Sequence, residues 1–229
     1  MRARQFCQWS APVAEAGTVL CVGLHLEGMA DWASQSVPFT TEHEQHEASR
    51  FVQMADAVRH LVGRALARRM LNAATGQSNS ATFARNPYGK PFCPQTDMDF
   101  SISHCADMVW VALCRTATVG IDLEQLRPLP DAAQLTSQLH PHERQALLAL
   151  PEDELQNAFF RCWTRKEAVL KACGTGLNTP LNSFCVSIGQ QQGNWILAAP
   201  ASSTCGAQCT DTTPHQWTSH DIAAPPSYQ

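Results

Sequence analysis

Charge is scarce in this 229-residue chain, and neither sign dominates it. Asp, Glu, Lys and Arg together make up 16% of the residues, and the formal net charge is −4. A protein that coats nucleic acid is expected to be basic, so this composition argues against a nucleic-acid partner. Apolar residues reach 44%, which favours a folded core over disorder. The length allows one domain or two small ones.

Long hydrophobic runs are also lacking. No apolar stretch approaches the roughly 18–20 residues that a helix needs to cross a bilayer. Arg2 and Arg4 near the start are not followed by the apolar segment of a secretory signal. We therefore expect a cytoplasmic protein without a membrane partner.

Cysteine pairs with the spacing of a metal site or redox motif are missing as well. None of the ten cysteines forms a Cys-x-x-Cys pair, and Cys205 and Cys209 are separated by three residues in a polar segment. Others lie in apolar stretches such as 110–114 and 184–186. In a cytosolic chain we expect reduced cysteines that pack like small apolar residues. The spacing of the cysteines and of the nine histidines does not favour a zinc site.

The apolar periodicity of the first half predicts strands and one long helix. Between residues 42 and 74 apolar residues recur at three- and four-residue steps, and Gly76 is placed to end the helix. Residues 86–91 have the composition of a turn. Strands are expected at 19–26, 100–103, 108–114 and 118–124, the last three being neighbours.

The second half starts again with helices. Pro141 suits a first helical position, and a longer helix is expected from about 153 to 173, with Gly174 just past its end. Strands are expected at 184–188 and 195–198. The pattern predicts two α+β halves that meet near 115–118, and we place the domains at 1–117 and 118–229.

The segment 119–124 places two carboxylates together. Val119, Ile121 and Leu123 alternate with Gly120, Asp122 and Glu124. In a strand of period two, both acids lie on the face opposite the apolar residues. A solvated face is the ordinary explanation of such a pattern. The alternative is a cation that joins the two like charges.

A helical segment adds a third carboxylate and lysines. Glu167 and Lys171 are four residues apart, so a helix places them on one side. Three carboxylates with lysines alongside suit a hard divalent cation held against a phosphate. Lys171 can instead be a surface partner of Glu167, worth a few tenths of a kcal/mol. Lys166 lies near the apolar stripe of this helix, where a lysine must reach solvent or find an anion. Trp163 is expected in the core.

Four motifs along the chain resemble one known family. They are Tyr88-Gly89-Lys90-Pro91, Phe100-Ser101-Ile102-Ser103-His104, Gly120-Ile121-Asp122-Leu123-Glu124 and Trp163-x-x-Lys166-Glu167-x-x-x-Lys171-x-x-Gly174. In this order and spacing they resemble the Sfp-type 4′-phosphopantetheinyl transferases. The resemblance runs from about residue 42 to 184.

The resemblance implies a fold and a reaction. The fold is α+β, a pseudo-twofold pair of similar α+β subdomains with the active site between them. The reaction moves 4′-phosphopantetheine from coenzyme A to a serine of an apo acyl or peptidyl carrier protein and releases 3′,5′-ADP. It needs Mg²⁺, for which Mn²⁺ can substitute. We expect the protein to act as a monomer.

The resemblance also implies roles for individual residues. Glu167 has two possible roles, metal ligand and general base toward the carrier serine, acting directly or through a water. Lys171 can neutralise charge on the leaving phosphate or protonate it. The implied metal ligands are Asp122, Glu124 and Glu167. The implied coenzyme A contacts are Arg50, Arg59, Lys90, Ser103, His104, Lys166 and Lys171.

One departure from the family pattern lies just before the long helix. Family members commonly carry basic residues before the long helix that hold the 3′-phosphate, but residues 41–47 here are acidic and histidine-rich. Arg50 is the only basic residue nearby, so the resemblance does not say how the 3′-phosphate is held. For the acidic carrier, we expect a solvent-facing arc of arginines. The candidates are Arg64, Arg68 and Arg69, with Arg161 and Arg165 as a second choice.

Two other functions remain open on the sequence. A catalytically silent module that binds coenzyme A or a carrier protein is expected to have lost a metal carboxylate or Lys171, and both are present. A phosphatase or nuclease with a two-metal site needs more converging carboxylates and histidines.

Overall fold

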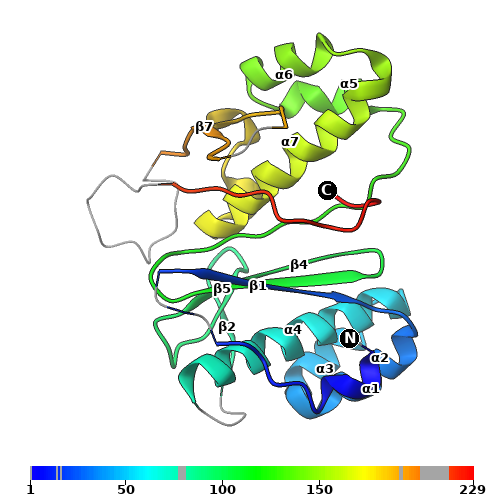
Figure 1. Ribbon diagram of the computed structural model, residues 1–229, viewed down its shortest axis with the longest axis vertical. Helices are drawn as coiled ribbons and strands as arrows, with labels where there is room; N and C mark the ends of the chain where they lie inside the picture. Colours follow the sequence, from blue (N-terminus) through cyan, green and yellow to red (C-terminus); the bar gives the residue numbers. More distant parts are fainter. Residues whose placement is uncertain (1, 14, 16, 77–80, 191–192, 202–216) are drawn as a thin grey trace. The chain divides into compact units, whose positions relative to one another are not determined.

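The computed structural model describes residues 2–13, 15, 17–76, 81–190, 193–201 and 217–229 of the chain (Figure 1). They form two compact units. Unit 1 comprises residues 1–86 and 91–122, and unit 2 comprises residues 87–90 and 123–229. Both units combine helices and strands, so the α+β fold class is confirmed. In the described part of the chain no helix is long and apolar enough to cross a membrane.

Unit 1 is built on one antiparallel sheet. The strand order is β1-β5-β4, and β2 and β3 form a separate two-stranded ribbon around the turn at 86–90. The elements of the unit are α1 (Ala3–Phe6), β1 (Val19–His25), α2 (Met29–Ser36), a 3₁₀ turn (Val37–Phe39), α3 (Glu42–Ala48), α4 (Met54–Thr75), β2 (Ala84–Arg85), β3 (Pro91–Phe92), β4 (Asp99–Cys105) and β5 (Met108–Cys114).

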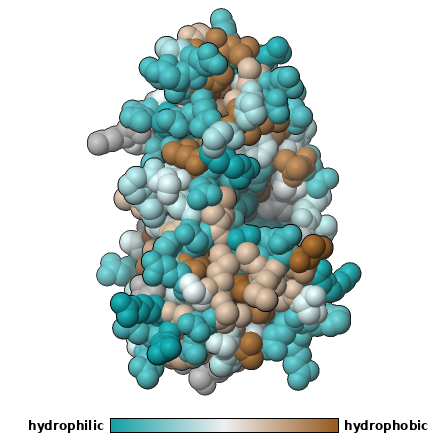
Figure 2. All heavy atoms as spheres, turned by 90° about the vertical axis from the view of Figure 1, so that its right-hand side faces the viewer, coloured by the Kyte–Doolittle hydropathy of each residue, from teal (hydrophilic) through white to brown (hydrophobic). Residues whose placement is uncertain are grey.

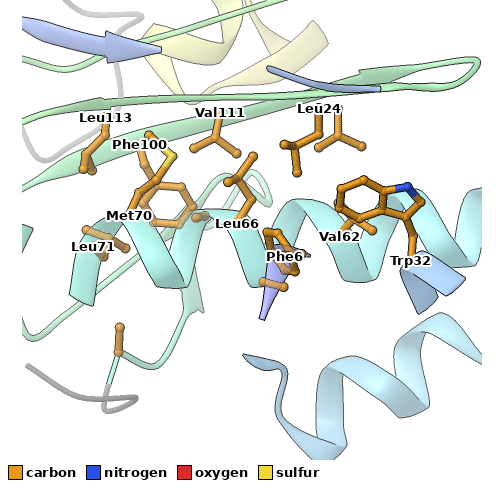
Figure 3. Close-up of a cluster of buried hydrophobic side chains, with 14 of the residues drawn as sticks. Phe6, Leu24, Trp32, Val62, Leu66, Met70, Leu71, Phe100, Val111 and Leu113 are labelled. Atoms are coloured by element: carbon orange, nitrogen blue, oxygen red, sulfur yellow. The ribbon is translucent and has the colours of Figure 1, made fainter. Parts of the chain in front are cut away.

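The long helix α4 covers one face of this sheet. Figure 3 shows Leu66 and Met70 of α4 on the side of the helix that faces Val111 and Leu113 of the sheet, and Val62 near Trp32 and Leu24. The helix and sheet approach closely at Gly63, where an added Cβ would lie 2.9 Å from a methyl group of Ile102. Gly76 ends α4 in the left-handed region with φ of 69°, as the sequence predicts.

The single helix expected over 42–74 is wrong, because two helices occupy this stretch. Thr41 caps α3 in a capping box with Glu44, and α3 ends at Ala48. The chain then leaves helical geometry before α4 begins at Met54. Phe51 and Met54 fit the apolar period, yet both are exposed. The apolar periodicity therefore continues across the break between α3 and α4, because exposed residues there are apolar at the same spacing.

The expectation that 118–124 forms a strand next to 100–103 and 108–114 is also wrong. The third strand of that sheet is β1. The main-chain N–H of Val119 donates to the Asp99 carboxylate (2.7 Å), and that of Ile121 donates to the Ser101 hydroxyl (3.2 Å). Side chains of β4, and not the backbone of a neighbouring strand, thus accept the main-chain hydrogen bonds of this segment. The predicted alternation is confirmed: Val119, Ile121 and Leu123 are buried, while Gly120, Asp122 and Glu124 are partly exposed.

Unit 2 is organised around the helix α7. Its core gathers apolar residues of α7 with Leu147, Phe184 and Trp195. The C-terminal residue pairs with the chain after 123, since Glu124 and Gln229 exchange two backbone hydrogen bonds (3.0 and 2.9 Å). The elements are α5 (Ala132–Leu135), a 3₁₀ turn (Thr136–Gln138), α6 (Pro141–Leu148), α7 (Glu152–Cys173), two further 3₁₀ turns (Gly176–Asn178 and Leu181–Ser183), β6 (Cys185–Val186) and β7 (Ile196–Ala198).

The described cysteines are free thiols, and most are buried, as expected from the sequence. The buried ones are Cys93, Cys114, Cys162, Cys173 and Cys185. Burial raises the pKa of the Cys21 thiol to about 11, which keeps it protonated near neutrality. The pair Cys205 and Cys209 lies outside the described residues.

Candidate active site

Asp122 is oriented by a neighbouring motif of the same unit. The Ser103 hydroxyl, on β4, donates to Asp122 Oδ1 at 2.9 Å. Ser103 is only 3% exposed, so this hydroxyl is held in place by the sheet. The hydrogen bonds of Asp99 and Ser101 to the backbone at 119 and 121 hold the same segment. Sequence reasoning missed this positioning role of Ser101, although Ser101 lies inside the Phe100–His104 motif.

The side chain of Arg59, on α4, reaches the turn that joins β4 to β5, and His104 lies on β4 just before this turn. The Arg59 guanidinium donates to the carbonyl of Ala106 (2.5 Å) and forms an ion pair with Asp56. Ala106 has a φ of 50°, which is uncommon for a residue with a side chain. His104 is an exposed residue near the end of β4. An imidazole, that of His104, therefore lies beside this turn. The guanidinium of Arg59 is hydrogen-bonded to the backbone of the turn at Ala106.

The end of α7 carries Glu167 and Lys171, and both are partly exposed. Gly174 ends the helix with φ of 70°, as predicted. Lys90 donates to the carbonyl of Ala172 at 3.4 Å, so the turn at 87–90 is attached to the last turn of this helix. A cation at a helix C-terminus is favourable because it meets the unsatisfied carbonyl groups. Two implied phosphate ligands therefore lie at the C-terminal end of α7: Lys171 on the helix itself, and Lys90 on the turn bonded to it.

Lys166 does not lie with these lysines. Its side chain is fully buried, and Nζ donates to Glu143 Oε1 (2.7 Å) and to the carbonyl of Phe184 (2.9 Å). The sequence required this lysine to reach solvent or find an anion, and it finds Glu143, which is also fully buried. We therefore reassign Lys166 from phosphate binding to the core of unit 2.

The arginines of α4 do not form the predicted solvent-facing arc. Arg68 is 3% exposed, with Nη2 and Nη1 at 2.9 and 3.0 Å from the two carboxylate oxygens of Glu44. Arg64 is 7% exposed. Arg69 lies over the Phe39 ring at 4.1 Å and donates to a carbonyl of the N-terminal segment. The prediction of a carrier patch here is wrong, because α3 and the segment before it cover this side of α4.

The second choice for a carrier patch, Arg161 and Arg165, is also held within the protein. Arg161 donates to the carbonyl of Ile188 at 2.8 Å. Arg165 is 2% exposed, forms an ion pair with Asp221 (2.6 Å) and lies 5.4 Å from the Trp195 ring centre. Figure 2 shows one face, on which hydrophilic residues are interspersed with apolar ones.

Two family models together match most of the chain. One is described as 4′-phosphopantetheinyl transferase, N-terminal, and matches residues 29–116; the other, described as 4′-phosphopantetheinyl transferase superfamily, matches residues 118–228. The chain is 32% identical to the 4′-phosphopantetheinyl transferase Sfp of Bacillus subtilis (strain 168), over 77% of this chain and 79% of that protein. This chain belongs to the 4′-phosphopantetheinyl transferase family. The family resemblance inferred from the four motifs is thereby confirmed.

Other relatives in the family are matched over somewhat less of their length. The chain is 34% identical to the transferase HetI of Nostoc sp. (strain PCC 7120 / SAG 25.82 / UTEX 2576), over 70% of each protein. It is 33% identical to the transferase gsp of Aneurinibacillus migulanus, over 66% of this chain and 63% of that protein. For gsp the match thus covers a little under two thirds of the relative.

Proposed function

We propose that this protein transfers 4′-phosphopantetheine from coenzyme A to a serine hydroxyl of an acyl or peptidyl carrier protein, in a magnesium-dependent reaction that releases 3′,5′-ADP. Family membership supports the reaction. The observation in the structure that supports it best is the hydrogen bond from Ser103 to Asp122, since it joins two of the four family motifs. We propose that the protein acts as a monomer.

We propose Asp122, Glu124 and Glu167 as the magnesium ligands. Among the described residues, no group of three or more His, Cys, Asp or Glu side chains lies together in a way that could bind a metal ion. Asp122 belongs to unit 1, and Glu124 and Glu167 belong to unit 2. Carboxylate oxygens are the ligands that magnesium prefers, which makes the donor set suitable. Bound magnesium would neutralise charge on the pyrophosphate of coenzyme A.

The roles of the remaining residues follow from the chemistry of the transfer. The serine oxygen forms a bond to the phosphorus that carries the pantetheine arm, and the bond from that phosphorus to the oxygen of the departing 3′,5′-ADP breaks. Glu167 accepts the serine proton, directly or through a water molecule. Lys171 and Lys90 offset the negative charge that develops on the departing phosphate. Arg59 and His104 bind the coenzyme A phosphates, as does Arg50.

The direct test is mass spectrometry of apo-carrier proteins incubated with coenzyme A and the protein. We expect the carrier to gain the mass of phosphopantetheine with Mg²⁺ or Mn²⁺ and not with a chelator. Asp122→Asn preserves the shape of the side chain and removes its charge, and we expect it to lose most of the transfer. Asp97→Asn, an exposed acid of the same unit, is the matched control. Full metal-dependent transfer by Asp122→Asn would exclude Asp122 as a ligand.

A second pair of variants tests the helix. Glu167→Gln should lower kcat more than coenzyme A affinity, because it removes the base and preserves the shape. Lys171→Ala should also lower kcat, since charge on the leaving phosphate would be left uncompensated. A loss of about 10²–10⁴-fold is typical for a general base. If both variants match the parent, α7 has only a structural role, and a silent binding module becomes the better explanation.

A further inference from the structure

Glu124, a proposed magnesium ligand, lies in a short antiparallel pair of backbone segments within unit 2. Its N–H donates to the carbonyl of Gln229 (3.0 Å), and the N–H of Gln229 donates back to the carbonyl of Glu124 (2.9 Å). A third bond, from the N–H of Leu126 to the carbonyl of Ser227 (2.8 Å), continues the same register. The main chain at Glu124 is therefore held by a segment that is distant in sequence.

The register of this pair decides on which face the Glu124 side chain lies. Residues directly opposite each other in an antiparallel pair project to the same face, and neighbours along a strand alternate between faces. Glu124 is opposite Gln229, and both residues are partly exposed. Leu123 and Tyr228 project to the other face, and both are buried. Turning the Glu124 carboxylate away from the open face would thus expose two apolar side chains.

The two acids of the 119–124 segment are held in different ways. Asp122 is oriented through its carboxylate, which accepts the Ser103 hydroxyl. For Glu124 the backbone bonds to Gln229 fix the Cα position, and with it the direction in which the side chain leaves the main chain. Magnesium requires near-ideal octahedral geometry, so its affinity depends on how each carboxylate is placed. Groups that orient a metal ligand typically lower metal affinity by about 10–100-fold when they are removed.

We propose that residues 227–229 are a positioning element of the metal site, and that Gln229 raises the affinity for magnesium by fixing Glu124. The backbone exchange between the two residues holds Glu124 on the open face of the pair, and the burial of Tyr228 anchors the segment that supplies this exchange. Gln229 itself binds neither the cation nor the substrates. The role of Glu124 as a metal ligand rests on the proposed function.

The test measures by calorimetry the affinity for Mn²⁺ of the protein saturated with coenzyme A. Gln229→Pro removes the N–H that donates to Glu124, and we expect it to weaken Mn²⁺ binding by about tenfold. Gln229→Ala keeps both backbone bonds and should match the parent. Ala223→Pro places a proline at an exposed position of the same segment. It is the matched control and should also match the parent.

A second background shows whether the effect passes through Glu124. In the Glu124→Gln protein, Gln229→Pro should cause no further loss of Mn²⁺ affinity, because the carboxylate that Gln229 positions is already absent. Tyr228→Ala removes the buried anchor and keeps every backbone group, so it should weaken Mn²⁺ binding with the same dependence on Glu124. Affinity for coenzyme A in the presence of a chelator should be unchanged in both variants.

Circular dichroism reports whether each variant is folded, and Tyr228→Ala decides the question if Gln229→Pro is not. The proposal is overturned if the folded variant binds Mn²⁺ like the parent. It is also overturned if the variant loses the same Mn²⁺ affinity with and without the Glu124 carboxylate, since that result would indicate a purely structural role.

Transfer assays separate this inference from the proposed function. With Gln229→Pro, the Mn²⁺ concentration for half-maximal transfer should rise by about tenfold, while kcat at saturating Mn²⁺ should return to the parent value. If the parent transfers phosphopantetheine and this concentration does not change in the variant, the inference fails and the function stands. If the parent binds Mn²⁺ through Glu124 and transfers to no carrier, the function fails, and calorimetry still decides the positioning role.

Discussion

The buried pair of Lys166 and Glu143 allows a test that separates a structural lysine from a phosphate ligand. Lys166→Met removes the bond to Glu143 (2.7 Å), the bond to the Phe184 carbonyl (2.9 Å) and the charge 4.0 Å from the Phe184 ring centre. Glu143 would then be buried as an uncompensated charge, retaining only backbone donors such as the N–H of Val186 (2.7 Å).

Breaking a buried pair in this way typically costs about 3–5 kcal/mol. For a unit of this size, 1 kcal/mol corresponds to roughly 4 °C, so we expect Tm to fall by about 12–20 °C. Urea unfolding followed by circular dichroism measures the loss independently of any ligand. Arg144→Met, an exposed cation on the same helix as Glu143, should change stability by less than about 0.5 kcal/mol.

A double variant sharpens the assignment. Glu143→Gln together with Lys166→Met removes both charges, so it should be more stable than Lys166→Met alone. The reasoning would be refuted if Lys166→Met kept the parent stability and instead lost affinity for coenzyme A. That result would return Lys166 to the phosphate site implied by its motif.

Two further predictions concern unit 1. Gly23→Ala should destabilise it by about 1–3 kcal/mol and alter tryptophan fluorescence, because the new Cβ would lie 2.4 Å from the Trp110 ring; Gly189→Ala, with its nearest neighbour at 3.7 Å, should have no such effect. Burial by itself raises the pKa of Glu44, but the hydrogen bonds from Arg68 and from a main-chain N–H outweigh it and hold the pKa below 4.5. Its stabilisation is therefore present above about pH 4.5 and is lost as the pH falls through the lowered value. The stability difference between the parent and Glu44→Gln should shrink between pH 7 and pH 3, and a constant difference would contradict this.

Much of the fold could be predicted because periodicity reports which side of an element is buried. The alternation at 119–124 was predicted correctly on that basis. Gly174 was predicted correctly from a different signal, the preference for glycine just past a helix end. Periodicity does not report which groups satisfy the backbone, so the contributions of Asp99 and Ser101 could not be foreseen. The expected pairing of that segment with the sheet was wrong for this reason.

The charged residues were harder to place. An arginine on an amphipathic helix is ordinarily assigned to solvent, but Arg68 meets Glu44 from α3. That contact joins residues distant in sequence, and no local pattern reveals it. Lys166 shows the same difficulty, because its partner Glu143 lies on another helix. The proposed roles of Asp122, Glu124, Glu167 and Lys171 stay predictions, as does the domain boundary at 117/118.

The turn at 87–90 has a consequence for how the chain can be divided. It is grouped with unit 2, although the residues on both sides of it belong to unit 1. A fragment that starts at residue 118 or 123 would therefore be made without Lys90 and without its bond to the end of α7. The turn precedes residues 91–122 of unit 1 in the sequence, although its lysine is bonded to helix α7 of unit 2. Split versions of this protein would have to supply that turn from the other fragment.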